Sequence, residues 1–122
     1  MTTTELRRRV LEKLQVLASG EPVNASDGQL VRGAYERLHE ILLDDDLVSF
    51  VASDDIPTDY AGPLVSLVAA ELVDEFHCPD GLKAKILIEG KYGSSPMSFA
   101  ERQLRKLSAP GFSGETAESE YF

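Results

Sequence analysis

Residues 62–73, Gly-Pro-Leu-Val-Ser-Leu-Val-Ala-Ala-Glu-Leu-Val, decide the fold of this chain. Their apolar side chains recur at steps of three and four, which is the spacing of a helix with a buried side. Ser66 and Glu71 interrupt the run, and the stretch is too short to cross a bilayer as a helix. The pattern predicts the central and most apolar helix of a bundle, starting near Thr58 or Asp59.

Two further helices are expected before this stretch. The first starts at Thr2, since Thr2 and Glu5 have the spacing of a capping box, and it is expected to end at residues 19–22, where Gly and Pro follow each other closely. The second starts near Ser26 and ends at residues 44–46, because three consecutive aspartates are unfavourable at the negative end of a helix dipole.

A last helical region starts near Asp80. Gly and Ser-Pro interrupt residues 90–96, so the region is expected to be either kinked or split, with a restart at Ser95-Pro96. Residues 47–51 have the composition of a short extended segment. They either pack as a loop on the helices or pair as an edge with a neighbouring molecule.

Composition favours one domain with its own core. Apolar residues make up 43% of the 122 residues and aromatic residues 7%, which is typical of a globular chain. The single cysteine, Cys78, fits a reducing compartment, and no apolar block follows the first arginines as in a signal peptide, so we expect a soluble protein made in the cytoplasm. The predicted fold is all-α, a small bundle of four helices, or five if the last is split, over residues 1–109. Residues 110–122 are expected to form an extended C-terminal arm.

Charge is unevenly distributed along the chain. The net charge is −9; residues 36–80 hold twelve acidic side chains and one basic, whereas residues 82–107 hold six basic and two acidic. A negative chain repels nucleic-acid phosphates, so simple DNA binding is not expected. The opposite signs can be compensated within one chain or between copies of it, and the sequence alone leaves both open.

No motif typical of catalysis or metal binding is present. The chain lacks a phosphate-binding glycine loop, and its two histidines and one cysteine do not have the spacing of metal ligands. His77-Cys78 is interpreted as a helix end rather than a zinc site or an activated thiol. Glu71 is the one candidate for a glycoside-hydrolase acid, and the solvent side of an amphipathic helix explains it as well. We therefore expect a non-enzymatic protein without cofactor or metal.

The arm has an unusual composition. Residues 111–122, GFSGETAESEYF, have no helical periodicity, and two aromatic residues follow three glutamates. Burying a phenylalanine side chain contributes about 1.5–3 kcal/mol, so the arm gains by docking on a surface. That surface belongs to another molecule or, alternatively, to the chain's own helices.

Several stretches together resemble a known family. They are Thr-Glu-Leu-Arg-Arg at residues 4–8, Leu-Val-Arg-Gly-Ala-Tyr-Glu-Arg-Leu at 30–38, Asp-Ile-Pro at 55–57, the Ala-rich helix at 63–72, Lys-Tyr-Gly at 91–93, Leu-Ser-Ala-Pro at 107–110 and Tyr-Phe at 121–122. Their order over nearly the whole chain resembles the tail accessory factors of short-tailed phages and the related head-to-tail adaptors of other phages and gene transfer agents. The interruption at residues 93–96 departs from the uninterrupted last helix of that family, and the chain also lacks a long C-terminal extension.

The resemblance implies a structural head-to-tail connector. Its subunits form a homo-oligomeric ring, dodecameric in the family, beneath the portal protein, where the ring seals the DNA-filled head and receives a tail or stopper protein. DNA passes through the lumen without specific binding, no membrane is involved, and the protein is located in the virion or gene-transfer particle. Matching positions assign docking on the portal or on a neighbouring subunit to Pro110, Phe112, Tyr121 and Phe122.

A ring requires two different patches on each subunit. We expect the acidic segment 36–80 and the basic segment 82–107 to supply them. The contacts between subunits are assigned to Asp44, Asp45, Asp46, Asp54, Asp55, Arg102, Arg105 and Lys106. The alternative from another class is a small helical regulatory module, of antitoxin or transcription-modulator type, that binds a basic partner through the acidic segment. A cell-wall hydrolase acting through Glu71 is a third alternative.

Overall fold

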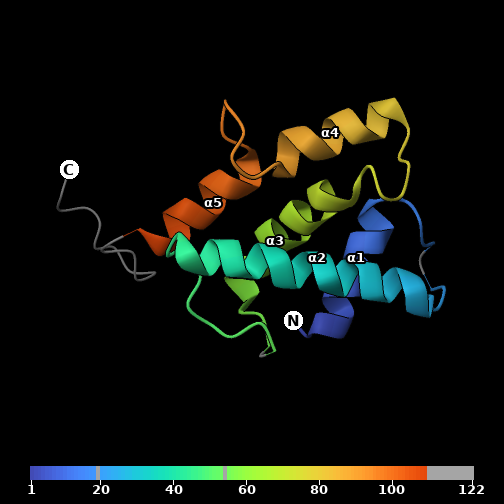
Figure 1. Ribbon diagram of the computed structural model, residues 1–122, viewed down its shortest axis with the longest axis horizontal. Coiled ribbons are helices and arrows are strands. Elements are labelled where there is room, and N and C mark those ends of the chain that lie inside the picture. The colour runs from blue at the N-terminus through green and yellow to red at the C-terminus, as the bar shows by residue number, and fades with distance from the viewer. Residues whose placement is uncertain (19, 54, 110–122) are drawn as a thin grey trace.

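The computed structural model of the protein describes residues 1–18, 20–53 and 55–109, and these residues form five α-helices and no strand (Figure 1). The helices are α1 (Thr3–Lys13), α2 (Ala25–Asp44), α3 (Thr58–Leu72), α4 (Asp80–Gly90) and α5 (Phe99–Ser108). The predicted all-α fold is confirmed, and the last helical region is split into two helices. No helix in the described part of the chain is both long enough and apolar enough to cross a bilayer.

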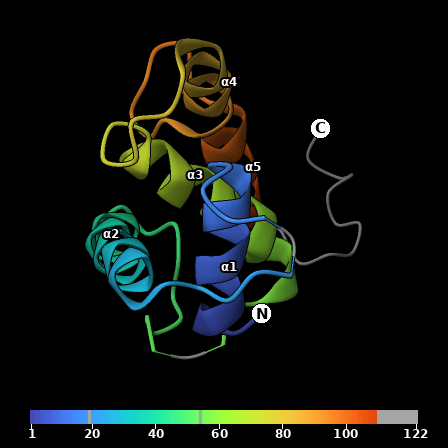
Figure 2. The same cartoon turned by 90° about the vertical axis from the view of Figure 1, so that its right-hand side faces the viewer.

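The apolar helix α3 lies at the centre of the bundle. It packs against each of the other four helices, whereas α1 and α2 pack on each other and α4 packs on α5. Figures 1 and 2 show α3 between these two pairs. Its start at Thr58 agrees with the prediction, and Leu64, Val68 and Ala69 are completely buried. The stretch that decides the fold is therefore the centre of the core.

The packing of α4 on α3 depends on one glycine. Gly90 is the last residue of α4, and a Cβ atom added there would lie 2.1 Å from the carbonyl oxygen of Ser66 on α3. Only a residue without a side chain allows the two backbones to approach this closely. An ion pair also links α1 to α4, since Nζ of Lys13 lies 2.7 Å from Oε1 of Glu89.

The first helix ends earlier than the sequence indicates. The expected end at residues 19–22 is wrong, because α1 stops at Lys13. Gln15 adopts a left-handed conformation with φ of 60°, and the Val16 N–H donates to the carbonyl of Leu11 at 3.0 Å. This bond pattern closes a helix in the way that glycine usually does.

Two other helical segments close in the same way without glycine. Asp46 has φ of 59° and His77 has φ of 51°. The Leu47 N–H donates to the carbonyl of Leu42 at 2.8 Å, and the Cys78 N–H closes the turn after α3 in the same manner. The predicted end of the second helix at the aspartates is confirmed.

One predicted helix start is confirmed and another is displaced. α2 was expected to start near Ser26 and starts at Ala25, after its N-cap Asn24, which accepts a bond from the Ser26 N–H at 2.8 Å. α5 does not restart at Ser95-Pro96, because Ser98 caps it through its side chain. In both cases a neighbouring side chain satisfies the first free N–H groups of the helix.

The segment between α2 and α3 packs as a loop, which is one of the two interpretations from the sequence. Leu47 and Val48 are buried. The Phe50 ring lies edge-on to His39 of α2 and to Tyr60 of α3, with ring centres 5.6 and 5.4 Å apart. His39 Nε2 also lies 2.7 Å from the carbonyl oxygen of Phe50. These contacts hold the loop against the bundle.

Candidate functional site

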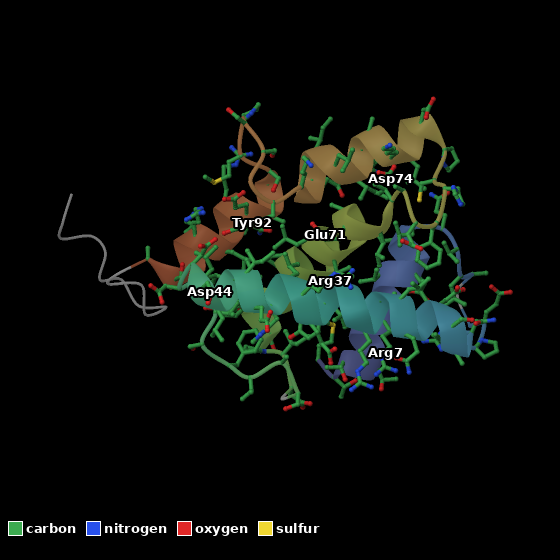
Figure 3. All side chains as sticks on the ribbon, viewed as in Figure 1. Arg7, Arg37, Asp44, Glu71, Asp74 and Tyr92 are labelled. Atoms are coloured by element: carbon green, nitrogen blue, oxygen red, sulfur yellow. The ribbon has the colours of Figure 1, made fainter. Side chains whose placement is uncertain are left out.

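The end of α2 is joined to α5 through Tyr92, which lies in the loop between α4 and α5. Its hydroxyl donates a hydrogen bond to the carboxylate of Asp45, and an Nη atom of Arg105 lies 3.5 Å from the same hydroxyl oxygen. Arg105 Nε donates to Glu101 Oε2 at 2.9 Å, and Glu101 Oε1 accepts from the Gly93 N–H at 2.8 Å. Figure 3 shows Tyr92 above the end of α2 that carries Asp44. Asp45 and Arg105, which the sequence assigned to contacts between copies, thus both contact Tyr92 within one chain.

The surroundings of Tyr92 and Arg105 determine whether each of these side chains is charged. Glu101 is only 3% exposed, and the bonds from Arg105 and Gly93 compensate the cost of burying its charge. Burial and then the hydrogen bond to Asp45 raise the pKa of Tyr92 to about 12. The hydrogen bond to Glu101 raises the pKa of Arg105. At neutral pH Tyr92 is therefore a neutral donor and Arg105 a permanent cation.

A second pair of opposite charges is compensated within the chain. Lys83 Nζ lies 2.6 Å from Asp74 Oδ1. The hydrogen bond between them raises the pKa of Lys83 and lowers the pKa of Asp74. This ion pair therefore compensates, within one chain, one charge of the acidic segment 36–80 and one charge of the basic segment 82–107.

The other residues predicted to contact a neighbouring copy, or to dock on the portal, are either exposed or outside the described part of the chain. Five are exposed and form no ion pair with another described residue: Asp44, Asp46, Asp55, Arg102 and Lys106. Asp54 and the predicted docking residues of the arm, Pro110, Phe112, Tyr121 and Phe122, lie outside the described residues.

One side of the α4–α5 pair exposes large apolar side chains beside two cations. Ile88 is 75% exposed and Phe99 is 57% exposed, and Cζ of Arg102 lies 5.8 Å from the centre of the Phe99 ring. Two adjoining hollows of about 590 Å³ each share Phe99 and Arg102; one reaches Lys106 and the other Met97. We call Ile88, Met97, Phe99, Arg102 and Lys106 the α4–α5 face. Exposed apolar surface bordered by charge is typical of a protein–protein contact.

The exposed side of α2 has the opposite charge. Glu40 and Asp44 are exposed one helical turn apart, and neither forms an ion pair with another described residue. Ile41 and Leu43 beside them are 47% and 45% exposed. We call these four residues the α2 face.

The residues considered for chemistry are Glu71 and Cys78. Glu71 is exposed on α3 (Figure 3). Burial, and to a lesser degree the charge of Asp74, raises the pKa of the Cys78 thiol, so the thiol is protonated at neutral pH. Within residues 1–18, 20–53 and 55–109, no three His, Cys, Asp or Glu side chains are grouped to hold a metal ion. The α2 face and the α4–α5 face, which can contact another protein, are therefore the candidate functional site.

Three members of the α4–α5 face were not predicted as contact residues: Ile88, Met97 and Phe99. Ile88 and Phe99 are next in sequence to Leu87 and Ala100, which pack in or against the core, whereas their own side chains are exposed. A large apolar side chain next to the buried side of its helix is the signal that identifies such a surface in a sequence.

Comparison with known proteins gives no relative: no family model, no curated protein and no solved structure matches this chain.

Proposed function

We propose that this chain is a structural, non-enzymatic subunit of the head-to-tail connector of a phage or gene-transfer particle. Copies of the bundle form a ring beneath the portal protein, seal the DNA-filled head and receive a tail or stopper protein. The order of sequence motifs supports this proposal, and the helical bundle is consistent with it. The net charge of −9 favours a lumen through which DNA moves without binding.

The observation that carries the proposal is the pair of exposed faces on one subunit. The α2 face is acidic and the α4–α5 face is basic, and each combines its charge with exposed apolar side chains. α3 lies between the helices that bear them (Figure 2). A subunit with two different faces on separate sides forms head-to-tail contacts, and such contacts close into a ring when the rotation permits.

The arm has a separate part in this proposal. Residues 110–122 come after α5 in the sequence and contain Phe112, Tyr121 and Phe122 together with three glutamates. We assign to them the docking on the portal or on a neighbouring subunit. The bundle then supplies the body of the ring, and the arm fastens it to the head.

The proposal is tested by mixing the purified full chain with the portal protein encoded by the same particle genome. Negative-stain images should show an additional ring of density on one end of the portal. Portals that remain unchanged, together with a chain that co-purifies with a small basic toxin or a transcription factor, would support the regulatory module instead.

A further inference from the structure

We infer that copies of this chain associate head to tail, with the α2 face of one copy seated on the α4–α5 face of the next. This inference deepens the proposed function, on which it rests for the closure of the contacts into a ring. The occupant of the α4–α5 face is a second copy, whose α2 supplies both carboxylates and apolar side chains.

The two faces carry opposite charges at the same spacing. Glu40 and Asp44 are four residues apart on α2, and Arg102 and Lys106 are four residues apart on α5. Side chains at this separation lie about 5–6 Å apart on one side of a helix. When α2 of one copy lies along α5 of another, each carboxylate therefore faces a cation.

The four charged side chains of the two faces are Glu40, Asp44, Arg102 and Lys106. None of them forms an ion pair with another residue in the part of the chain that the structure describes. Asp45 and Arg105 are excluded from the contact, because Tyr92 and Glu101 already engage them. Among the exposed charges without an ion pair, we assign to the contact the two pairs that lie one turn apart on a single helix within the two faces, Glu40 with Asp44 and Arg102 with Lys106.

Apolar side chains supply the surface that the contact buries. Ile41 and Leu43 on the α2 face are about half exposed, and Ile88 and Phe99 on the α4–α5 face are more exposed still. Exposed ion pairs contribute little to affinity, because water screens them and ordering the side chains costs entropy. Burial of these apolar groups provides most of the affinity, and the charges select the partner face and its orientation.

Arg37 sets a limit to the contact on α2. It is exposed one turn before Ile41, on the same helix (Figure 3). A basic side chain at that position opposes a basic partner, so the α4–α5 face lies over the carboxyl-terminal turns of α2.

The test is self-association of the full chain, followed by analytical ultracentrifugation over a range of concentrations at low salt. One variant reverses the α2 face with Glu40→Lys and Asp44→Lys, and another reverses the α4–α5 face with Arg102→Glu and Lys106→Glu. Like charges then face each other, so each variant alone should associate roughly tenfold or more weakly than the wild type. An equimolar mixture of the two should associate like the wild type, because each face again meets its opposite.

Matched controls separate this contact from a general charge effect. Glu71→Lys with Glu75→Lys and Arg9→Glu with Arg32→Glu make equal charge changes at exposed residues that belong to neither face, and both should leave association unchanged. Circular dichroism verifies that every variant retains its helices.

Three results would overturn the inference: a wild type that stays monomeric at every concentration, reversals without effect, or a mixture that fails to restore association. Loss of association on deletion of residues 111–122 with no effect of the reversals would assign the contact to the arm instead. None of these results tests the place of the protein in a particle, so a failure here is distinguishable from a failure of the proposed function.

Discussion

The hydroxyl of Tyr92 donates a hydrogen bond to the carboxylate of Asp45, 47 residues away along the chain. This bond links the end of α2 to the loop before α5, two parts of the bundle whose helices do not pack on each other. It adds a direct link between the parts of the molecule that carry the α2 face and the α4–α5 face, in addition to the packing of their helices on α3.

Removing the hydrogen bond between Tyr92 and Asp45 should destabilise the protein. Tyr92→Phe and Asp45→Asn should each lower the free energy of unfolding by about 1 kcal/mol, as is usual for a single hydrogen bond. The double variant should cost less than the sum of the two, because both changes remove the same interaction. Urea unfolding of the four proteins gives this coupling, and strict additivity would show that the two side chains do not interact.

Stability should fall at high pH through two tyrosines. Burial raises the pKa of Tyr35 to about 12, and burial with the bond to Asp45 raises the pKa of Tyr92 to about 12, whereas an ordinary tyrosine titrates near 10. The unfolded chain therefore loses these protons first. The contribution of the two tyrosines to the free energy of unfolding is complete below pH 10 and is lost as the pH rises toward 12.

The two tyrosines can be separated from other groups that titrate in this range. Tyr35→Phe and Tyr92→Phe should each flatten the decline in the free energy of unfolding between about pH 10 and 12. Urea unfolding at several pH values measures the slope. Equal slopes in the wild type and both variants would assign the alkaline loss of stability to other groups.

The close approach of α4 to α3 predicts opposite effects at two glycines. Gly90→Ala should lower the free energy of unfolding by about 1–3 kcal/mol, because the new methyl group overlaps the Ser66 carbonyl. Gly62→Ala is the matched control: Gly62 lies inside α3 with open space around its Cβ position, so alanine should stabilise the protein by up to about 1 kcal/mol. Thermal unfolding compares the two, and a tolerated alanine at position 90 would contradict the described helix crossing.

Deletion of residues 111–122 tests the arm. In the proposed connector the deletion removes docking on the portal and leaves the helices intact, since the described core lies within residues 6–104. We expect filled heads without attached tails in electron micrographs of particles that carry the truncated chain. Normal particle yield with this chain would remove the arm from the docking proposal.

The sequence predicted those parts of the fold that depend on patterns along one helix. The capping box of Thr2 and Glu5 is present, and α3 is the buried centre because its apolar side chains cover most of its surface. The helix ends near Asp44 and His77 were also predicted, whereas the end of the first helix was not. Gln15 closes α1 in a conformation that usually indicates glycine, so its residue type gave no local signal for this end.

The candidate site depended on relations that a single sequence does not contain. Asp45 and Arg105 belong to segments of opposite charge, yet only the fold reveals that Tyr92 joins them within one chain. Conversely, Arg105 lies one turn after Glu101 and pairs with it, whereas Arg102 and Lys106 point in other directions around α5. This distinction is contained in the helical period, but only the fold shows that Glu101 is buried.

Quantitative mass spectrometry of purified particles tests most directly the proposal that this chain is a connector subunit. The particles are those produced by the cells or phage that encode the chain. We expect one copy of this chain for each copy of the portal protein, retained through density-gradient purification. Its absence from particles that contain the portal would contradict the proposal.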